Sequence, residues 1–277
     1  MKPVPPLPLS AVGGLPLRSR LPLWRRAVRL LGRQLFRLAE NNDDARQDRN
    51  GEEWLLRELL QRHAHSGEKR PFVVFDVGGN VGDYTRAVLR LARATGCPVA
   101  VHVFEPSPHC VATLQAAFAG EAAVRLTAAA AGPAAGEARL HGELGSGHAS
   151  LLPRDVLRDA PAPAITVPVI ALGDYLRAQG VGHIDLLKLD IEGSELGALR
   201  GLGDRLDPAI IRMIQFEYGG ANLDGRSTLR DFYDLLGARG YRMAKLFPAA
   251  LEVRRYAPWM EHYAYANYVA VAVPGEP

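Results

Sequence analysis

The segment from Phe72 to Thr85, FVVFDVGGNVGDYT, decides the fold of this chain. It begins with four consecutive apolar residues, passes through Asp76 into a glycine-rich turn, and leads into the amphipathic stretch TRAVLRLARA. A short apolar run followed by a turn and a helical pattern indicates a buried parallel strand, a tight loop and a helix. Glycines in such a loop let backbone N–H groups approach a ligand at the start of the helix.

The spacing of the glycines separates two kinds of nucleotide site. A dinucleotide fingerprint, G-x-G-x-x-G, opens on a glycine, whereas this loop opens on an acid and has the spacing Asp76-x-Gly78-x-x-x-Gly82. A carboxylate suits a cofactor that carries an ammonium and a sulfonium, as S-adenosylmethionine (SAM) does, better than it suits a pyrophosphate. Taken alone, the loop is equally compatible with an ordinary strand–turn–helix corner.

The next two strands extend the nucleotide interpretation. The stretch VAVHVF at 99–104 is predicted to be a strand that ends in Glu105. An acid at that point is well placed to accept hydrogen bonds from ribose hydroxyls, although a surface acid or a helix cap is the alternative. A third strand is expected over 124–130, and the small residues at its end would let an adenine ring approach.

Acidic residues also follow two later strands. The apolar run 184–189 ends in Asp190-Ile191-Glu192-Gly193, and a strand over 210–216 is followed by Glu217. Open α/β sheets bind ligands at the carboxyl ends of their strands, so these side chains are candidates for a site. His148, in the stretch GSGHAS at 145–150, is interpreted as a loop histidine.

Strand and helix patterns alternate to the end of the chain. They predict about seven strands, with helices over 108–118, 172–179, 194–200 and 228–238. The last strand is expected over 267–273 and to run antiparallel, because no long helical pattern precedes it. This is an α/β fold with the architecture of Rossmann-like class I methyltransferases, plus an N-terminal helical extension.

The chain is predicted to have three parts, two of which precede the α/β domain. Residues 1–22 hold six prolines and are predicted to be disordered. Residues 23–70 form a helical extension, with helices over 23–39 and 52–65, and residues 71–277 form the α/β domain. The first helix has an apolar stripe and a basic side, so contact with an anionic membrane surface is conceivable. Packing of the stripe on the domain or on a sister subunit is the favoured interpretation.

Composition limits which other classes of protein this chain could belong to. The chain has 277 residues, of which 48% are hydrophobic, and no apolar run approaches the roughly 20 residues of a membrane span. The net charge of +3 reflects seven arginines without an acid in residues 17–39, and no basic patch interleaved with aromatics supports nucleic-acid binding. The two cysteines form neither a metal spacing nor a disulfide framework, and we expect a reducing, cytoplasmic setting. The Ala- and Arg-rich composition suggests a bacterial source.

Four blocks together resemble the FkbM family of SAM-dependent methyltransferases: FDVGGNVGDYT (75–85), VFEPSP (103–108), IDLLKLDIEGSELGALRG (184–201) and FEYGG (216–220). The resemblance covers roughly residues 71–273 and implies O-methylation of a hydroxyl on a sugar, glycoconjugate or natural product. It departs from the family pattern at Gly173, where the family has an aspartate that Asp174 could replace. The resemblance also implies contacts of Glu105 with the ribose and of five residues with the methionine part of SAM: Asp76, Gly78, Asn80, Gly82 and Thr85.

Methyl transfer to a hydroxyl requires alignment and a base. Positioning supplies on the order of 7–11 kcal/mol, and a base that removes the hydroxyl proton supplies about 10²–10⁴-fold. Our hypothesis is that Asp190 or Glu192 is this base, with Asp190 preferred because Glu192 could instead cap the helix near Ser194. A divalent metal at Asp190, Glu217 and Asn222 is conceivable but disfavoured, because no spacing rule supports it. The rival functions are a non-catalytic SAM- or glycan-binding module and an NAD-dependent oxidoreductase.

Overall fold

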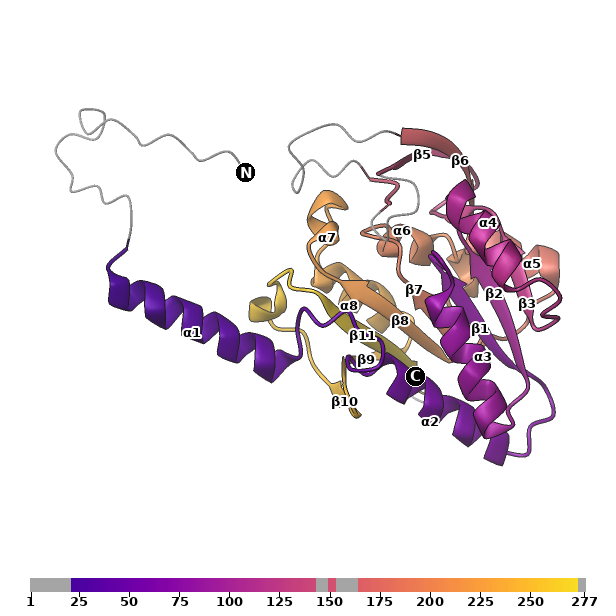
Figure 1. The fold of residues 1–277 in the computed structure, drawn as a ribbon, viewed down its shortest axis with the longest axis horizontal. Helices are drawn as coiled ribbons and strands as arrows, with labels where there is room; N and C mark the ends of the chain where they lie inside the picture. Colours follow the sequence, from indigo (N-terminus) through magenta and orange to yellow (C-terminus); the bar gives the residue numbers. More distant parts are fainter. Residues whose placement is uncertain (1–20, 143–148, 153–163, 274–277) are drawn as a thin grey trace.

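A computed structural model describes residues 21–142, 149–152 and 164–273. Its centre is an eight-stranded sheet with the order β10-β9-β11-β8-β7-β1-β2-β3 (Figure 1). The five strands β8, β7, β1, β2 and β3 run parallel, and β11 is antiparallel to both of its neighbours. The strands are β1 (Phe72–Val77), β2 (Val99–Phe104), β3 (Val124–Thr127), β7 (Leu186–Leu189), β8 (Met213–Tyr218), β9 (Tyr241–Phe247), β10 (Ala250–Val253) and β11 (Ala266–Ala272).

Helices cover both faces of the sheet, and each face has its own apolar core. Helices α2, α3 and α4 contribute to one core, and α5, α6 and α8 contribute to the other. The α-helices are α1 (Leu23–Glu40), α2 (Glu52–His65), α3 (Asp83–Thr95), α4 (Pro108–Ala117), α5 (Leu172–Gln179), α6 (Glu195–Arg200), α7 (Ala221–Asp224) and α8 (Leu229–Gly237), and short 3₁₀ turns lie at Gly203–Arg205 and Pro258–Met260.

Strand β1 lies between β2 and β7, and this arrangement positions the site. Val77 at the end of β1 is in register with Phe104 at the end of β2 and with Leu189 at the end of β7. From β1, the chain first adds β2 and β3 on one side of this strand and later adds β7 and β8 on the other side. Open parallel sheets bind ligands in the crevice at such a switch point. The loops after these three strands therefore start level with one another at one edge of the sheet.

The predicted fold class is confirmed, and two strand predictions differ in detail. The predicted antiparallel last strand is β11. The expected strand over 124–130 ends at Thr127, and Ala130–Ala131 instead form β4 in a second sheet of order β4-β6-β5, with β5 over Gly136–His141 and β6 over Ala164–Ile170. The run of alanines from 128 to 131 contains no turn residue that would mark this change of direction. The hairpin strand β10 adds an eighth strand to the predicted seven.

The two helices of the N-terminal extension differ in their surroundings. Leu55, Leu56 and Leu60 of α2 are buried in the core beside α3. In α1, by contrast, no residue is buried, and the helix projects away from the sheet (Figure 1). The sequence analysis favoured packing of the apolar stripe of α1 on the domain or on a sister subunit. The structure shows no packing of this stripe on the domain. Residues 1–20 of the predicted disordered leader and His148 lie outside the described residues.

Candidate active site

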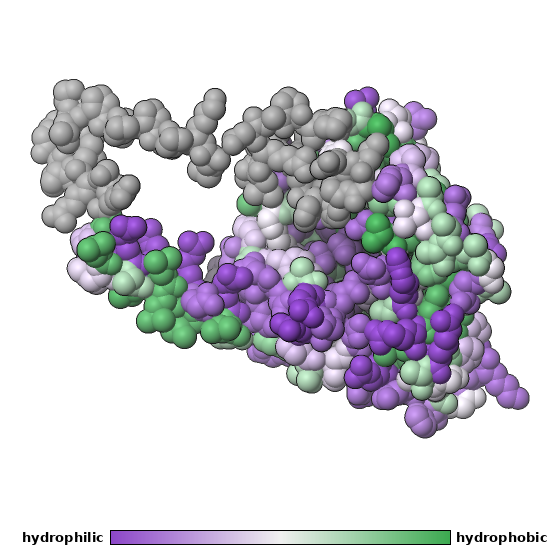
Figure 2. Space-filling view, in the orientation of Figure 1, coloured by the Kyte–Doolittle hydropathy of each residue, from purple (hydrophilic) through white to green (hydrophobic). Residues whose placement is uncertain are grey.

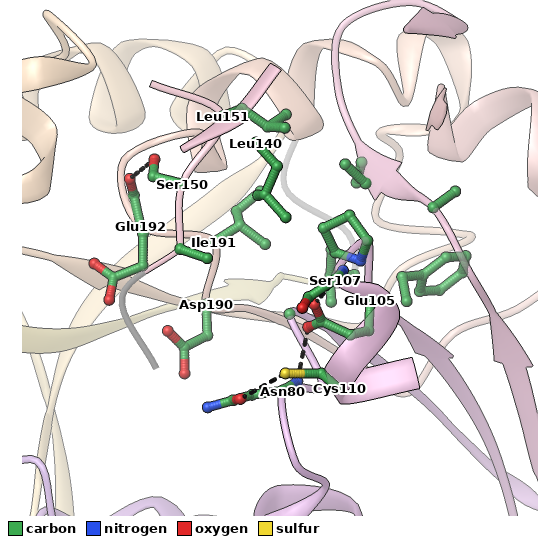
Figure 3. A pocket seen from close by; sticks show the side chains of 18 residues that line it. Asn80, Glu105, Ser107, Cys110, Leu140, Ser150, Leu151, Asp190, Ile191 and Glu192 are labelled. Atoms are coloured by element: carbon green, nitrogen blue, oxygen red, sulfur yellow. Dashed lines mark hydrogen bonds between the residues drawn. The ribbon is translucent and has the colours of Figure 1, made fainter. Parts of the chain in front are cut away.

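A pocket opens at the carboxyl ends of β1, β2 and β7 (Figure 3). Its volume is about 660 Å³ when its open mouth is counted. One side is formed by Gly78, Asn80 and Glu105, and the other by Asp190, Ile191 and Glu192. The wall between them is formed by Phe104, Cys110, Leu140, the three alanines 129–131 and the segment 149–151.

The loop after β1 is held tightly against its neighbours. The backbone N–H groups of Gly78 and Gly79 both donate to the carbonyl oxygen of Phe104, at 2.9 and 3.1 Å. A Cβ atom at position 78 would lie 1.9 Å from the carbonyl oxygen of Asp190. Only glycine fits there, so the β1 and β7 loops meet backbone to backbone beneath the pocket.

Glu105 joins the β1 loop to the end of β2. One of its carboxylate oxygens accepts the backbone N–H of Asn80 at 2.9 Å, and the other accepts that of Ser107 at 2.8 Å. Burial raises the pKa of Glu105, and the two backbone donors oppose this rise. Asn80 has a left-handed backbone and its side-chain oxygen accepts from the Cys110 thiol. The predicted ribose acid thus lines the pocket while it shapes the loop.

Three predicted cofactor residues lie behind the pocket wall rather than in it. Asp76 is fully buried and accepts a 2.6 Å hydrogen bond from the Thr85 hydroxyl, and its second oxygen has no partner among the described residues. Burial raises the pKa of Asp76, and nearby Lys188 partly offsets the rise. Gly82 precedes α3 and is packed against Leu114. Asp76, Thr85 and Gly82 are therefore placed to support the loop from below.

A buried polar cluster that the sequence analysis did not find lies under the same loop. Lys188 is 2% exposed, and its ammonium group lies 2.7 Å from an oxygen of Asp190 and 4.0 Å from one of Glu52. The ammonium also sits 4.8 Å above the ring of Tyr84. Although burial opposes its charge, the carboxylates of Asp190, Glu52, Asp76 and Glu217 hold the pKa of Lys188 well above its ordinary value.

Glu52 brings the N-terminal extension into this cluster. It is buried at the start of α2 and accepts hydrogen bonds from Asn50 at 2.9 Å and Gln215 at 2.6 Å. Burial and the charge of Asp190 raise the pKa of Glu217, which accepts from the Tyr265 hydroxyl. Helix α2 therefore supplies a charged group beneath the loops of the pocket.

The β7 loop presents the two predicted catalytic acids. The Asp190 carboxylate is 31% exposed and one of its oxygens is held by Lys188. Glu192 has a left-handed backbone with φ of 54°, and its carbonyl oxygen accepts from the Ser150 hydroxyl (Figure 3). The backbone N–H groups of Ile191 and Gly193 donate to Glu195, at 3.0 and 3.1 Å, so Glu195 holds this loop in shape.

Residues 149–151 reach the pocket, whereas Tyr218 at the end of β8 does not. Ala149, Ser150 and Leu151 line it, whereas Tyr218 is fully buried and donates its hydroxyl to Glu261. A second cavity shares Ala131 and Leu151 with the first and contains Arg200, Arg226 and Asp231. The two cavities are therefore adjacent, and together they offer room for more than one ligand.

The metal hypothesis and the suggested role of Asp174 gain no support. Among the described residues, no group of three or more His, Cys, Asp and Glu side chains is arranged to hold a metal ion. Both ends of the Asn222 amide are occupied, since it accepts from the Gly219 N–H and donates to Ser227. Asp174 lies at the surface and pairs with Arg177. A Cβ at Gly173 would lie 2.5 Å from the Leu202 carbonyl oxygen, so no aspartate fits there.

A parallel sheet closed by an inserted antiparallel strand, with a glycine loop after β1 and an acid after β2, defines a Rossmann-like methyltransferase. The family model described as "Methyltransferase FkbM domain" matches residues 76–243, which is more than half of the chain. The chain therefore belongs to the FkbM methyltransferase family, as its sequence blocks indicated.

One sequence relative agrees with this assignment, and two solved structures resemble the chain more weakly. The chain is 31% identical over 193 residues to the 31-O-demethyl-FK506 methyltransferase FkbM of Streptomyces tacrolimicus, a match that covers 58% of this chain and 73% of that protein. Among solved structures, a methyltransferase FkbM from Methylobacillus flagellatus KT has 17% identity and a TM-score of 0.45 over 76% of this chain. The CMeT domain of the citrinin polyketide synthase has 12% identity and a TM-score of 0.46 over 82%. The chain spans about half the length of each of these two structures, 47% and 52%.

Proposed function

We propose that this methyltransferase uses SAM to methylate a hydroxyl group of a small-molecule or glycan acceptor. The observation that carries the proposal is the pocket at the ends of β1, β2 and β7, which brings the Gly78 loop and Glu105 to face Asp190. The name of the Streptomyces relative refers to an O-methylation of a natural product, which supports a hydroxyl as the acceptor. The free, buried cysteines agree with the expected cytoplasmic setting, which stays a prediction.

The residues present fit the proposed cofactor. Alanines 129–131 leave a flat apolar wall for an adenine, and Glu105 presents a carboxylate for ribose hydroxyls. The tight backbone approach at Gly78 suits the methionine end, and the buried charge of Asp76 beneath that loop favours a cationic group above it. Thr85 and Gly82 would act indirectly, because they hold Asp76 and the start of α3 in place.

The proposed chemistry divides between the ligand and the chain. When bound, SAM supplies an electrophilic methyl group with a good leaving group. The chain positions the acceptor oxygen and takes up its proton, for which we propose the Asp190 carboxylate. Lys188 holds one oxygen of this carboxylate at 2.7 Å, so the other oxygen is left to face the pocket. The adjacent cavity that contains Arg200 and Arg226 is the proposed site of the acceptor.

The test compares three variants in SAM titration calorimetry and in a turnover assay with a panel of hydroxyl acceptors. Asp190→Asn should lower turnover by about 10²–10⁴-fold and leave SAM affinity nearly unchanged. Glu105→Ala should weaken SAM binding, because it removes the ribose acid and releases the Asn80 N–H. Glu192→Gln tests the other candidate base, which lines the same pocket, and should keep a turnover close to that of the wild type.

Each outcome separates the alternatives. Full turnover by Asp190→Asn would refute its role as the base. SAM binding without turnover on any hydroxyl acceptor would favour a SAM-binding module, and a product methylated on carbon would overturn the O-methyl assignment. Absence of SAM binding to the intact protein would remove the cofactor proposal itself.

A further inference from the structure

Helix α1 carries a continuous apolar surface that the rest of the described chain does not cover. Its large apolar side chains are 57–78% exposed, and no residue of the helix is buried. Figure 2 shows these side chains gathered along one side of the projecting helix. The exposed residues are Leu23, Trp24, Val28, Leu30, Leu31, Leu35 and Leu38.

The charged residues of α1 occupy the opposite side. At 3.6 residues per turn, the seven exposed apolar residues fall within an arc of about 160°, and all five arginines fall, together with Phe36, within a separate arc of about 120°. The helix has no acid before Glu40 at its end. It is therefore divided lengthwise into an exposed apolar half and a side whose charged residues before Glu40 are all cationic: Arg25, Arg26, Arg29, Arg33 and Arg37.

Only the last turns of α1 are attached to the body. Phe36 contacts the rings of Trp259 and His262 edge-on, with centroids 6.3 and 5.2 Å apart. Glu40 pairs with Lys245 at 2.9 Å and with Arg254 at 2.6 Å. Among the described residues, these contacts and the pair between Arg37 and Asp43 connect the helix to the rest of the protein. Most of the stability of a helix in a protein comes from packing of its apolar face, so the apolar face of α1 needs a partner.

We propose that α1 lies in the surface of an anionic lipid membrane, with its apolar half among the acyl chains and its arginines among the phosphate groups. A helix with a large apolar face, a basic polar face and a tryptophan has the composition of interfacial helices. Within the described part of the chain, no helix is long and apolar enough to span a membrane, so α1 lies along the surface rather than across it.

Charge decides between a membrane and a second copy of the chain. Two copies of α1 packed by their apolar faces would leave the arginines of each helix on its outer side, where the other copy supplies no acid to pair with them. Such a contact would cover the apolar half and leave the cationic side without a complement. An anionic bilayer supplies negative charge along the whole length of the helix, about 27 Å, and so complements this surface.

The experiment measures co-sedimentation of the full chain with vesicles of phosphatidylcholine containing about 30% phosphatidylglycerol, and with vesicles of phosphatidylcholine alone. We expect binding to the anionic vesicles that weakens at about 0.5 M salt. The double variants Leu31→Glu/Leu35→Glu and Arg29→Glu/Arg33→Glu should each bind roughly tenfold more weakly or worse. Val253→Glu and Arg62→Glu place a glutamate at one exposed apolar and one exposed basic position, on β10 and α2, and should bind like the wild type.

Two results would overturn the proposal. The first is equal binding of the wild type and the α1 variants to anionic vesicles, or no binding by any of them. The second is light scattering that shows a dimer which Leu31→Glu/Leu35→Glu dissociates, together with no vesicle binding by the wild type. Thermal melts of every variant verify that the body stays folded, which is expected because residues 29–35 make no buried contact.

Discussion

At the scale of single residues, buried charge is concentrated around the Lys188 ammonium group. Four carboxylates raise its pKa, and three of them, Glu52, Asp76 and Glu217, have raised pKa values because they are buried. One cation thus offsets the charge of several acids that come from different parts of the sequence. Breaking such a buried pair by removal of one partner leaves charges without compensation.

Lys188→Met should therefore destabilise the protein by about 3–5 kcal/mol in urea unfolding. The loss should be smaller near pH 5.5 than near pH 8. A carboxyl group whose pKa is higher in the folded state favours folding below its unfolded pKa and loses that contribution as the pH rises. Lys69→Met, at an exposed lysine, is the matched control. Equal stability of the two variants would show that the cluster does not need its cation.

Glu195 provides a second test that depends on pH. Burial raises its pKa from 4.5 to about 7, although it accepts two backbone N–H groups. Because the folded pKa is the higher one, its protonation favours folding below about pH 4.5, and this contribution is lost as the pH rises to about 7. The stability of the wild type relative to Glu195→Gln should therefore fall by roughly 2 kcal/mol between about pH 5.5 and about pH 7.5. A difference that stays constant or grows over this range, in urea unfolding, would contradict the assignment.

The residues of the site show which features the sequence could reveal. Gly78, Asn80, Glu105, Asp190 and Glu192 line the pocket because each directly follows a strand whose apolar pattern is unmistakable. Asp76 lies within β1 rather than after it, and its side chain points inward to the Thr85 hydroxyl. The cluster around Lys188 joins residues far apart in the chain, and no local pattern signals such a meeting.

At the scale of elements, α1 and α2 look alike in sequence and differ in packing. Both are amphipathic, yet Leu56 of α2 is fully buried and Leu31 of α1 is 61% exposed. The periodicity of apolar residues predicted both helices, because it shows which side of a helix is apolar. For α2 it also predicted the observed ends. It does not report what that side contacts, which is why the stripe of α1 was expected on the domain.

A matched pair of leucine substitutions measures this difference. Leu56→Ala should cost about 2–5 kcal/mol in urea unfolding, because it removes a side chain from a core shared with α3. Leu31→Ala should change stability by less than about 0.5 kcal/mol. Similar losses at both positions would mean that α1 is packed on the body in solution.

At the scale of the whole molecule, helix α2 connects the predicted N-terminal extension to the α/β domain. Helix α2 contributes Leu55, Leu56 and Leu60 to the core and Glu52 to the buried cluster. The domain division itself stays a prediction. The contacts favour a structural unit that begins near Glu40, where Lys245 and Arg254 fix the end of α1.

A shortened chain that starts at Glu40 should keep its fold and its methyl transfer to an acceptor in solution. Its melting temperature should shift by less than about 3 °C, which corresponds to about 1 kcal/mol for a domain of this size. A chain that starts at Gly67 should unfold or aggregate, because it exposes the core face covered by α2 and removes Glu52. If the shorter chain proved equally stable in thermal melts, the boundary near residue 70 would be correct.

The contact between Gly78 and Asp190 restricts how this sequence can vary. A Cβ at 78 would collide with the Asp190 carbonyl oxygen, whereas at Gly96, which has a similar left-handed backbone, nothing lies within 4 Å of the added atom. A library randomised at both positions and selected for folded protein should accept asparagine at 96, because asparagine tolerates this backbone conformation. At 78 it should return glycine alone. Because the clash is with a backbone oxygen, no change of side chain at 190 would relieve it, and glycine is expected to stay fixed at 78.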